Sequence, residues 1–318
     1  MVREGGRDME WLKNSKIKAV VGLSLIGYLL GFFFSGCGGK KEVFVSQYKG
    51  RSIAKDSRGN QYKIVYKSRP SYGSDIFVYK SGDGQNWKEM GRIPSYGYET
   101  YEAWGYSLAY DEDKNILGFV CIGTGKGKKA VYFTKSLDNG KTWSNPVPIN
   151  DDIWAQRTYP KIAIKGENIF VAWVEESESF SSKKERPSGI YFCSSYDFGE
   201  SWSENVWVRG GEDFWIEADP EGGVYLAYVG GRNQNIIYLS YSEDKGKTWH
   251  TQTTDELPMV VRELYITLAG KSLYLIFQGV RPNVSHLIVG INPDYELYYL
   301  KSEDKGKTWS KITRLKEE

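Results

Sequence analysis

Cysteine and histidine are scarce in this chain, whose 318 residues contain three Cys and two His. Cys37 lies near the N-terminus, which leaves Cys121 and Cys193, each inside an apolar stretch. We expect these two to be buried free thiols, with a disulfide in an oxidising compartment as the alternative. Together with His250 and His286 they are too few for a metal site built from His and Cys, so we expect no metal and no cofactor.

The chain also lacks a surplus of charge of one sign, with 42 Lys and Arg against 40 Asp and Glu. The first 36 residues carry five basic and three acidic side chains, so the rest of the chain has 37 of each. A domain without a basic surplus offers no electrostatic footprint for a polyanion, and nucleic acid is therefore not an expected partner.

Long hydrophobic runs are absent except for Ala19–Phe34, which follows three lysines within residues 13–18. This order of basic and apolar regions is typical of an export signal. The next residues, FSGCGGKKE, resemble the lipobox of bacterial lipoproteins, in which small residues precede a cysteine that is lipidated, here Cys37. Phe34 stands where that family usually has Leu.

These features divide the chain into a signal peptide or membrane anchor at 1–36, a tether at 37–44 and one domain at 45–318. The alternative to a lipid anchor is an uncleaved helix, because about 18 apolar residues are at the threshold for spanning a bilayer. In both cases we expect an exported domain that is anchored to the cell membrane or envelope.

Aromatic residues are abundant, at 15% with 24 Tyr and 11 Trp, as in many β-rich proteins. One octapeptide, SEDKGKTW, occurs at both 242–249 and 302–309. Three related copies are SLDNGKTW from Ser136, SYDFGESW from Ser195 and the shorter SGDGQNW from Ser81. Five copies at intervals of 47 to 60 residues indicate a repeat architecture.

Each copy follows a β-branched and aromatic segment, namely DIFVYKS, KAVYFTKS, GIYFCSS, IIYLSYS and ELYYLKS. Two further strand-like segments precede it and a weaker one follows it, so each unit reads as a four-stranded antiparallel meander. Radial repetition of such sheets predicts an all-β fold, a β-propeller with five blades, six being the alternative.

The repeated peptide is suited to lock the hairpin between the third and fourth strands. An Asp carboxylate can accept backbone N–H groups of its own turn, Gly permits a positive φ, and Trp packs on the blade. We therefore assign a structural role to Asp83, Asp138, Asp197, Asp244, Asp304, Trp87, Trp143, Trp202, Trp249 and Trp309.

These copies resemble the Asp-box (BNR) repeat family, with the pattern S-x-D-x-G-x-T-W, which is best known from sialidases. Four copies match every defining position if Ser201 is accepted for Thr, and the resemblance covers about residues 45–318. It implies a β-propeller, which has six blades in sialidases. It implies no single function, because such propellers include sialidases, other glycosidases, receptors and non-catalytic assembly factors.

In each meander the box turn shares one face, the box face, with the turn between the first two strands. The remaining connections meet at the opposite face, here called the ligand face, where binding residues are expected. The candidates on and beside these connections are Arg69, Arg157, Arg232, Arg281, Trp104, Trp154 and Trp215. Guanidinium groups pair with carboxylates and aromatic rings stack on sugars, so this set favours an acidic glycan; a solvated rim without a ligand is the alternative.

The sialidase resemblance implies a carboxylate clamp of three arginines. Arg51 stands where that family opens its first blade with R-I-P, but the Pro is missing. Arg69 lies ahead of the first box as the second clamp residue does, Arg232 closes a matching strand pair, and Arg281 would complete the clamp with unfamiliar spacing.

The same resemblance implies three catalytic residues. Asp75 would be the general acid, Tyr265 the nucleophile and Glu212 the group that activates it. In sialidases the nucleophile follows the last box, whereas Tyr265 precedes one.

Our main hypothesis is a tethered propeller that binds an acidic glycan or a partner protein of the cell envelope without turnover. A sialidase-like exo-glycosidase is the second hypothesis, and a cell-envelope assembly factor that docks proteins on its rim is the third. Whether the chain is an enzyme is therefore open from the sequence.

Overall fold

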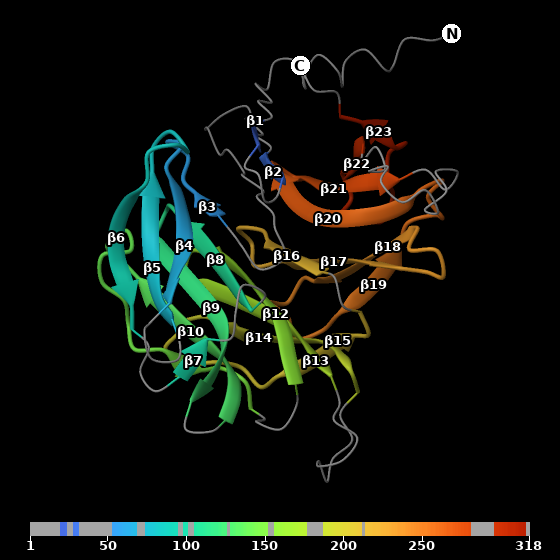
Figure 1. Ribbon diagram of the computed structural model, residues 1–318. Coiled ribbons are helices and arrows are strands. Elements are labelled where there is room, and N and C mark those ends of the chain that lie inside the picture. The colour runs from blue at the N-terminus through green and yellow to red at the C-terminus, as the bar shows by residue number, and fades with distance from the viewer. Residues whose placement is uncertain are drawn as a thin grey trace.

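The computed structural model describes residues 20–23, 28–31, 53–68, 74–94, 98–100, 105–125, 128–151, 156–176, 187–211, 214–280 and 296–315. Every regular element in these ranges is a β-strand. Five antiparallel sheets follow one another in chain order around a common centre, from blade one in blue and cyan to blade five in orange and red (Figure 1). The prediction of an all-β propeller with five blades is confirmed.

Each blade uses four consecutive strands, with the first strand nearest the centre. Blade one contains β3 (Ile53–Lys55), β4 (Gln61–Ser68), β5 (Ser74–Ser81) and β6 (Lys88–Ile93). Blade two contains β8 (Tyr106–Asp111), β9 (Ile116–Gly125), β10 (Lys128–Ser136) and β11 (Val147–Pro148). Blade three contains β12 (Gln156–Lys165), β13 (Asn168–Glu176), β14 (Gly189–Ser195) and β15 (Val206–Arg209).

Blade four contains β16 (Phe214–Ala218), β17 (Val224–Gly230), β18 (Ile236–Ser242) and β19 (His250–Thr253). Blade five contains β20 (Val260–Ala269), β21 (Ser272–Val280), β22 (Glu296–Ser302) and β23 (Thr313–Arg314). The fourth strands β11 and β23 have two residues each, in agreement with the weaker fourth strand expected from the sequence.

An additional strand in blade two, β7 (Tyr98–Thr100), pairs with the end of β9. This strand lies between the last strand of blade one, β6, and the first strand of blade two, β8. It pairs there because β9 extends beyond β8: Tyr106 of β8 lies opposite Cys121, which leaves Gly123–Gly125 for β7. Strand β10 begins with two lysines, Lys128 and Lys129, which pair with Gly125 and Thr124 of β9.

A separate hairpin joins β1 (Val20–Leu23) to β2 (Tyr28–Gly31) within the segment predicted as a leader. The rest of residues 1–36 and Cys37 lie outside the described residues, so the signal peptide and the lipid anchor stay predictions. Among the described residues, no helix is sufficiently long and apolar to cross a membrane.

The middle strands of blade three are buried on both faces because this sheet packs between two neighbours. All seven residues of β14 are buried, and so are seven of the nine residues of β13. Cys121 and Cys193 lie in this interior as free thiols, which confirms that prediction, and burial raises the pKa of the Cys193 thiol well above its ordinary value.

Four apolar clusters join consecutive blades. Representative members are Tyr62 and Phe119 between blades one and two, Phe133 and Trp173 between two and three, Phe192 and Leu226 between three and four, and Leu239 and Phe277 between four and five. Burial of these large side chains supplies the main free energy of the fold.

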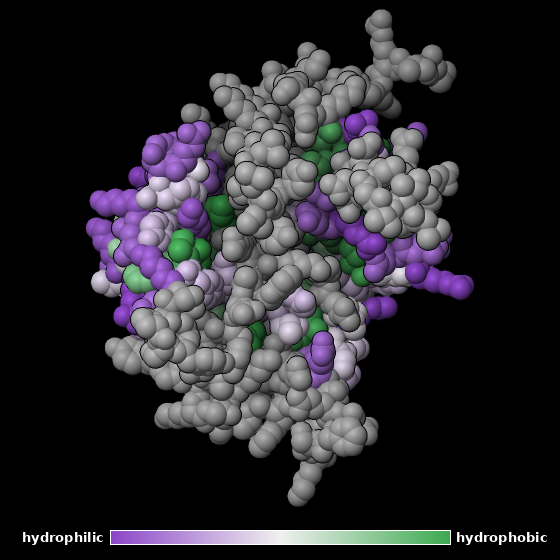
Figure 2. Space-filling model, viewed as in Figure 1, coloured by the Kyte–Doolittle hydropathy of each residue, from purple (hydrophilic) through white to green (hydrophobic). Residues whose placement is uncertain are grey.

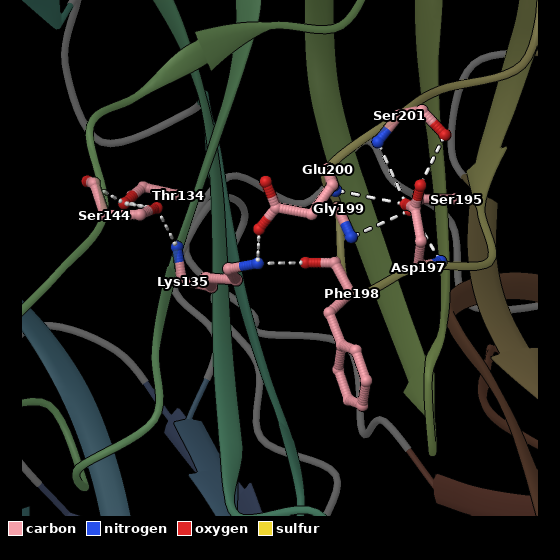
Figure 3. A network of polar contacts seen from close by, with 9 residues as sticks. All are labelled: Thr134, Lys135, Ser144, Ser195, Asp197, Phe198, Gly199, Glu200 and Ser201. Carbon is pink, nitrogen blue, oxygen red and sulfur yellow. Dashed lines mark hydrogen bonds and ion pairs between the residues drawn. The ribbon is translucent and has the colours of Figure 1, made fainter.

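The box turn of blade three shows how the repeated peptide closes its hairpin (Figure 3). Ser195 donates its hydroxyl to Asp197 and accepts the Gly199 N–H, at 2.7 and 2.8 Å. The Asp197 carboxylate also accepts the backbone N–H of Ser201 at 2.9 Å and the Ser201 hydroxyl. The turn is therefore closed by its own side chains and needs no external ligand.

The glycine of each later box packs against the preceding blade. A Cβ added to Gly246 would lie 2.1 Å from the Phe192 ring, and one added to Gly199 would lie 2.3 Å from Phe133. Gly140 and Gly306 meet Val78 and Leu239 in the same way. Each contacted residue stands three positions before the box Ser of its own blade, so the box locks one blade onto the next.

The junction between blade five and blade one differs from the other four within the described residues. Gly84 in the first box meets Gln61 of its own blade, and Lys63 of that blade lies 3.9 Å above the Trp87 ring. On blade five, a cluster around Tyr274 and Tyr299 contains Trp215 of blade four but no described residue of blade one. We call this junction the seam.

The outer part of blade one is polar rather than apolar. Lys67 pairs with Glu89 at 2.7 Å and lies 4.1 Å from the Phe77 ring, and both charged side chains are exposed. Figure 2 shows a largely hydrophilic surface over this blade.

Candidate functional site

The predicted site residues divide into those that the structure describes and those that it does not. Those outside the described residues are Cys37, Arg51, Arg69, Trp104, Trp154, Glu212 and Arg281. For Arg157 the structure describes the backbone, which lies in β12 opposite Glu175. Asp75, Trp215, Arg232 and Tyr265 can be described in full.

Asp75 lies near the start of β5, at the ligand-face end of blade one. Arg92 of the neighbouring strand β6 donates to its carboxylate at 2.6 Å, and the carboxylate is 25% exposed. This ion pair gives Asp75 a partner within its own sheet.

Arg232 lies in the turn between β17 and β18, on the ligand face of blade four. Several hydrogen bonds hold this turn: Gln234 N–H donates to the Gly231 carbonyl at 3.1 Å, and Val261 N–H donates to the Gln234 carbonyl at 2.8 Å. Arg262 of β20 also donates to the Gln234 side chain. The Arg232 side chain is exposed and makes no hydrogen bond or ion pair with any described residue, so a fixed turn presents an unengaged guanidinium group.

Trp215 and Tyr265 lie on the first strands of blades four and five, which contact each other along the central axis. Their ring centroids are 5.4 Å apart in an edge-to-face arrangement. Lys161, on the first strand of blade three, places its ammonium group 5.0 Å from the centre of the Trp215 ring. The fold therefore joins the predicted ligand-binding Trp215 with the predicted nucleophile Tyr265, and adds a lysine that the sequence pattern did not indicate.

Two further carboxylates were missed, Glu175, which is buried, and Glu217, which is half-buried. Glu175 ends the buried part of β13 at the ligand face, with 1% exposure, and accepts the Trp173 indole N–H at 2.9 Å. Glu217 lies in β16, where burial raises the pKa of its carboxyl group and the charge of Lys165 partly offsets this effect. Both are acidic residues inside otherwise apolar strands, which is the only sequence signal that could have revealed them.

The five predicted box carboxylates all lie in turns on the opposite face. Hydrogen bonds from Ser201 and Thr308 lower the pKa values of Asp197 and Asp304 to about 2. The pKa values of Asp83, Asp138 and Asp244 are lowered as well. Within the described part of the chain, His, Cys, Asp and Glu form no group of three or more that could hold a metal ion.

Comparison with known proteins assigns the family. The model of the BNR repeat-like domain matches residues 72–318, and the chain belongs to this family. A sialidase of Bacteroides fragilis (strain YCH46) is 26% identical over 192 residues, which is 57% of this chain and 33% of that protein. The match thus spans about a third of the length of that relative.

Solved structures share the fold at low sequence identity. The Hadza microbial sialidase Hz136 has a TM-score of 0.57 at 16% identity, over 93% of this chain and 68% of its own. The GH93 α-L-arabinofuranosidase of Fusarium graminearum, in complex with arabinobiose, has a TM-score of 0.51 at 13% identity, over 80% and 81%. At these identities the likeness concerns the fold alone.

Proposed function

We propose that this chain is an exported, membrane-tethered BNR propeller that binds an acidic glycan on its ligand face without turnover. The tether rests on the predicted leader and on Cys37. The choice of an acidic glycan as the ligand is supported by the family, whose relatives named above include a sialidase, and by the arginine and aromatic side chains of the ligand face.

The observation that carries this proposal is the unengaged Arg232 guanidinium on its fixed turn. A guanidinium group pairs with a carboxylate through two parallel hydrogen bonds, and a rigid turn lowers the entropy cost of forming them. Trp215 lies at the same end of blade four and offers a half-buried aromatic surface to a sugar.

The absence of turnover is proposed from the two described members of the catalytic set. Asp75 is held by Arg92 within the sheet of blade one, whereas Tyr265 packs edge to face on Trp215 between blades four and five. A sialidase would need both to reach one substrate.

The test is calorimetric titration of the full-length chain in detergent with 3′-sialyllactose. Arg232→Ala should weaken binding by about tenfold to a hundredfold, since a hydrogen bond to a charged group contributes about 1.5–3 kcal/mol. The control is Arg58→Ala on the box face, which should leave binding unchanged.

A fluorogenic sialoside should be bound but not cleaved by the same preparation. Cleavage that both Asp75→Asn and Tyr265→Phe abolish would replace this proposal with the sialidase-like enzyme. A folded protein that binds no glycan but retains an envelope protein would replace it with the assembly factor.

A further inference from the structure

The first strands of blades three and five contain the same irregularity. In β12 the register shifts between Thr158 and Lys161, and Tyr159 has a φ of 52°. In β20 it shifts between Arg262 and Leu264, and Glu263 has a φ of 38°. Counted back from the glycine turn that ends each strand, Tyr159 and Glu263 occupy the same position.

Such backbone is strained for residues other than glycine. Bulges of this kind redirect the side chains that follow them, and they are frequent beside functional sites. Lys161 and Tyr265 each lie two residues beyond the left-handed residue and are therefore equivalent. Two blades thus aim the equivalent side chain at the central axis.

The target of both side chains is Trp215 on the intervening blade. The Lys161 ammonium lies 5.0 Å from the centre of its ring, within the range of a cation–π contact, and the Tyr265 ring meets it edge to face at 5.4 Å. Trp215 and Lys161 are half-buried, whereas Tyr265 is 4% exposed. The arrangement restrains the indole from two sides and leaves part of it accessible.

We propose that Lys161, Trp215 and Tyr265 form the floor of the glycan site, where Trp215 stacks on a sugar and Lys161 pairs with the carboxylate of that sugar. The inference rests on the proposed function and names the ligand class. The ligand is a sugar that carries its carboxylate on the same ring that stacks on Trp215. Tyr265 is a positioning residue that acts through Trp215. The ammonium and the indole are close enough for one acidic sugar to contact both, and partial burial strengthens the ion pair relative to open water.

The experiment compares two probes with the full-length chain: 3′-sialyllactose and its methyl ester, which keeps the sugar rings and removes the charge. Lys161→Met should weaken binding of the acid about tenfold more than binding of the ester, because only the acid loses the ion pair. Lys165→Met, four residues further along the same strand, removes an equal charge and should change neither affinity.

The roles of the two rings are separated by a second set of variants. Trp215→Leu should weaken binding of both probes, because stacking does not depend on the acid group. Tyr265→Phe should retain binding and Tyr265→Leu should weaken it for both probes. Binding should change the indole fluorescence of the wild type, and this change should be lost in Trp215→Phe.

The outcomes distinguish the inference from the proposed function. If the wild type binds the acid and Arg232→Ala weakens it, while Lys161→Met affects acid and ester equally, the inference is overturned and the proposed function stands. A wild type that binds neither probe overturns both. An unchanged affinity of Trp215→Leu for both probes overturns the stacking role by itself.

Discussion

At the scale of single residues, the box carboxylates are hydrogen-bond acceptors for their own turns. Asp197 and Asp304 each accept a side-chain hydroxyl, from Ser201 and Thr308, in addition to backbone N–H groups. These bonds favour the ionised form, and they lower both pKa values to about 2, from an ordinary value near 3.8.

Folding stability should therefore depend on the charge state of the boxes. Because the pKa is lower in the folded chain, the stabilisation is complete above about pH 4 and is lost as the pH falls towards 2. The thermal midpoint should decrease over this window. Asn replacement at both Asp197 and Asp304 should flatten the decrease, since Asn does not titrate.

The matched control is Asp255→Asn, an exposed carboxylate outside the boxes. It should leave the acid slope as in the wild type. Equal slopes for the wild type and the double box variant would show that the box hydrogen bonds do not couple folding to pH.

At the scale of elements, the box connects two blades as well as two strands. The glycine of a later box needs its left-handed backbone, φ 89° at Gly246, and also the space beside the ring of the preceding blade. Gly84 in the first box also needs left-handed backbone. It does not need space beside a ring of another blade, because a Cβ added there would meet only the flexible end of the Gln61 side chain.

Alanine at the two glycines should thus have unequal effects. Gly84→Ala should reduce the free energy of unfolding by about 1–2 kcal/mol through backbone strain. Gly246→Ala should cost about 1–3 kcal/mol more, because the new methyl group overlaps the Phe192 ring. Urea denaturation of both variants measures the difference, and equal losses would contradict the interblade lock.

At the scale of the whole molecule, the described apolar packing between blades is weaker at the seam than at the other four junctions. Blades two, three and four each have apolar clusters on both sides, whereas the described clusters join blade one to blade two alone. Local opening is easiest where few buried contacts must break, so blade one is expected to open before the central blades.

Native-state hydrogen exchange should reveal this order. The amides of β4 and β5 should exchange faster than those of β13 and β14, whose side chains are almost all buried. Equal protection in blades one and three would show that the seam is as stable as the other junctions.

Part of the ligand face could be anticipated from the sequence. The position of Arg232 follows from strand order, because the turn between the second and third strands of a meander lies opposite the box. The meeting of Trp215 and Tyr265 could not be anticipated, since about fifty residues separate them and their contact depends on the angle between blades four and five.

The sequence by itself determined the five blades, because hydrogen bonds within eight residues close each box and strand periodicity is local. Only the tertiary structure decided which side chains of different blades meet, as Lys161, Trp215 and Tyr265 do. Those contacts arise from two bulges and from the packing of successive sheets, whose geometry is the sum of many long-range contacts. For the same reason the repeat predicts five similar units, while the seam becomes visible only when the units are assembled.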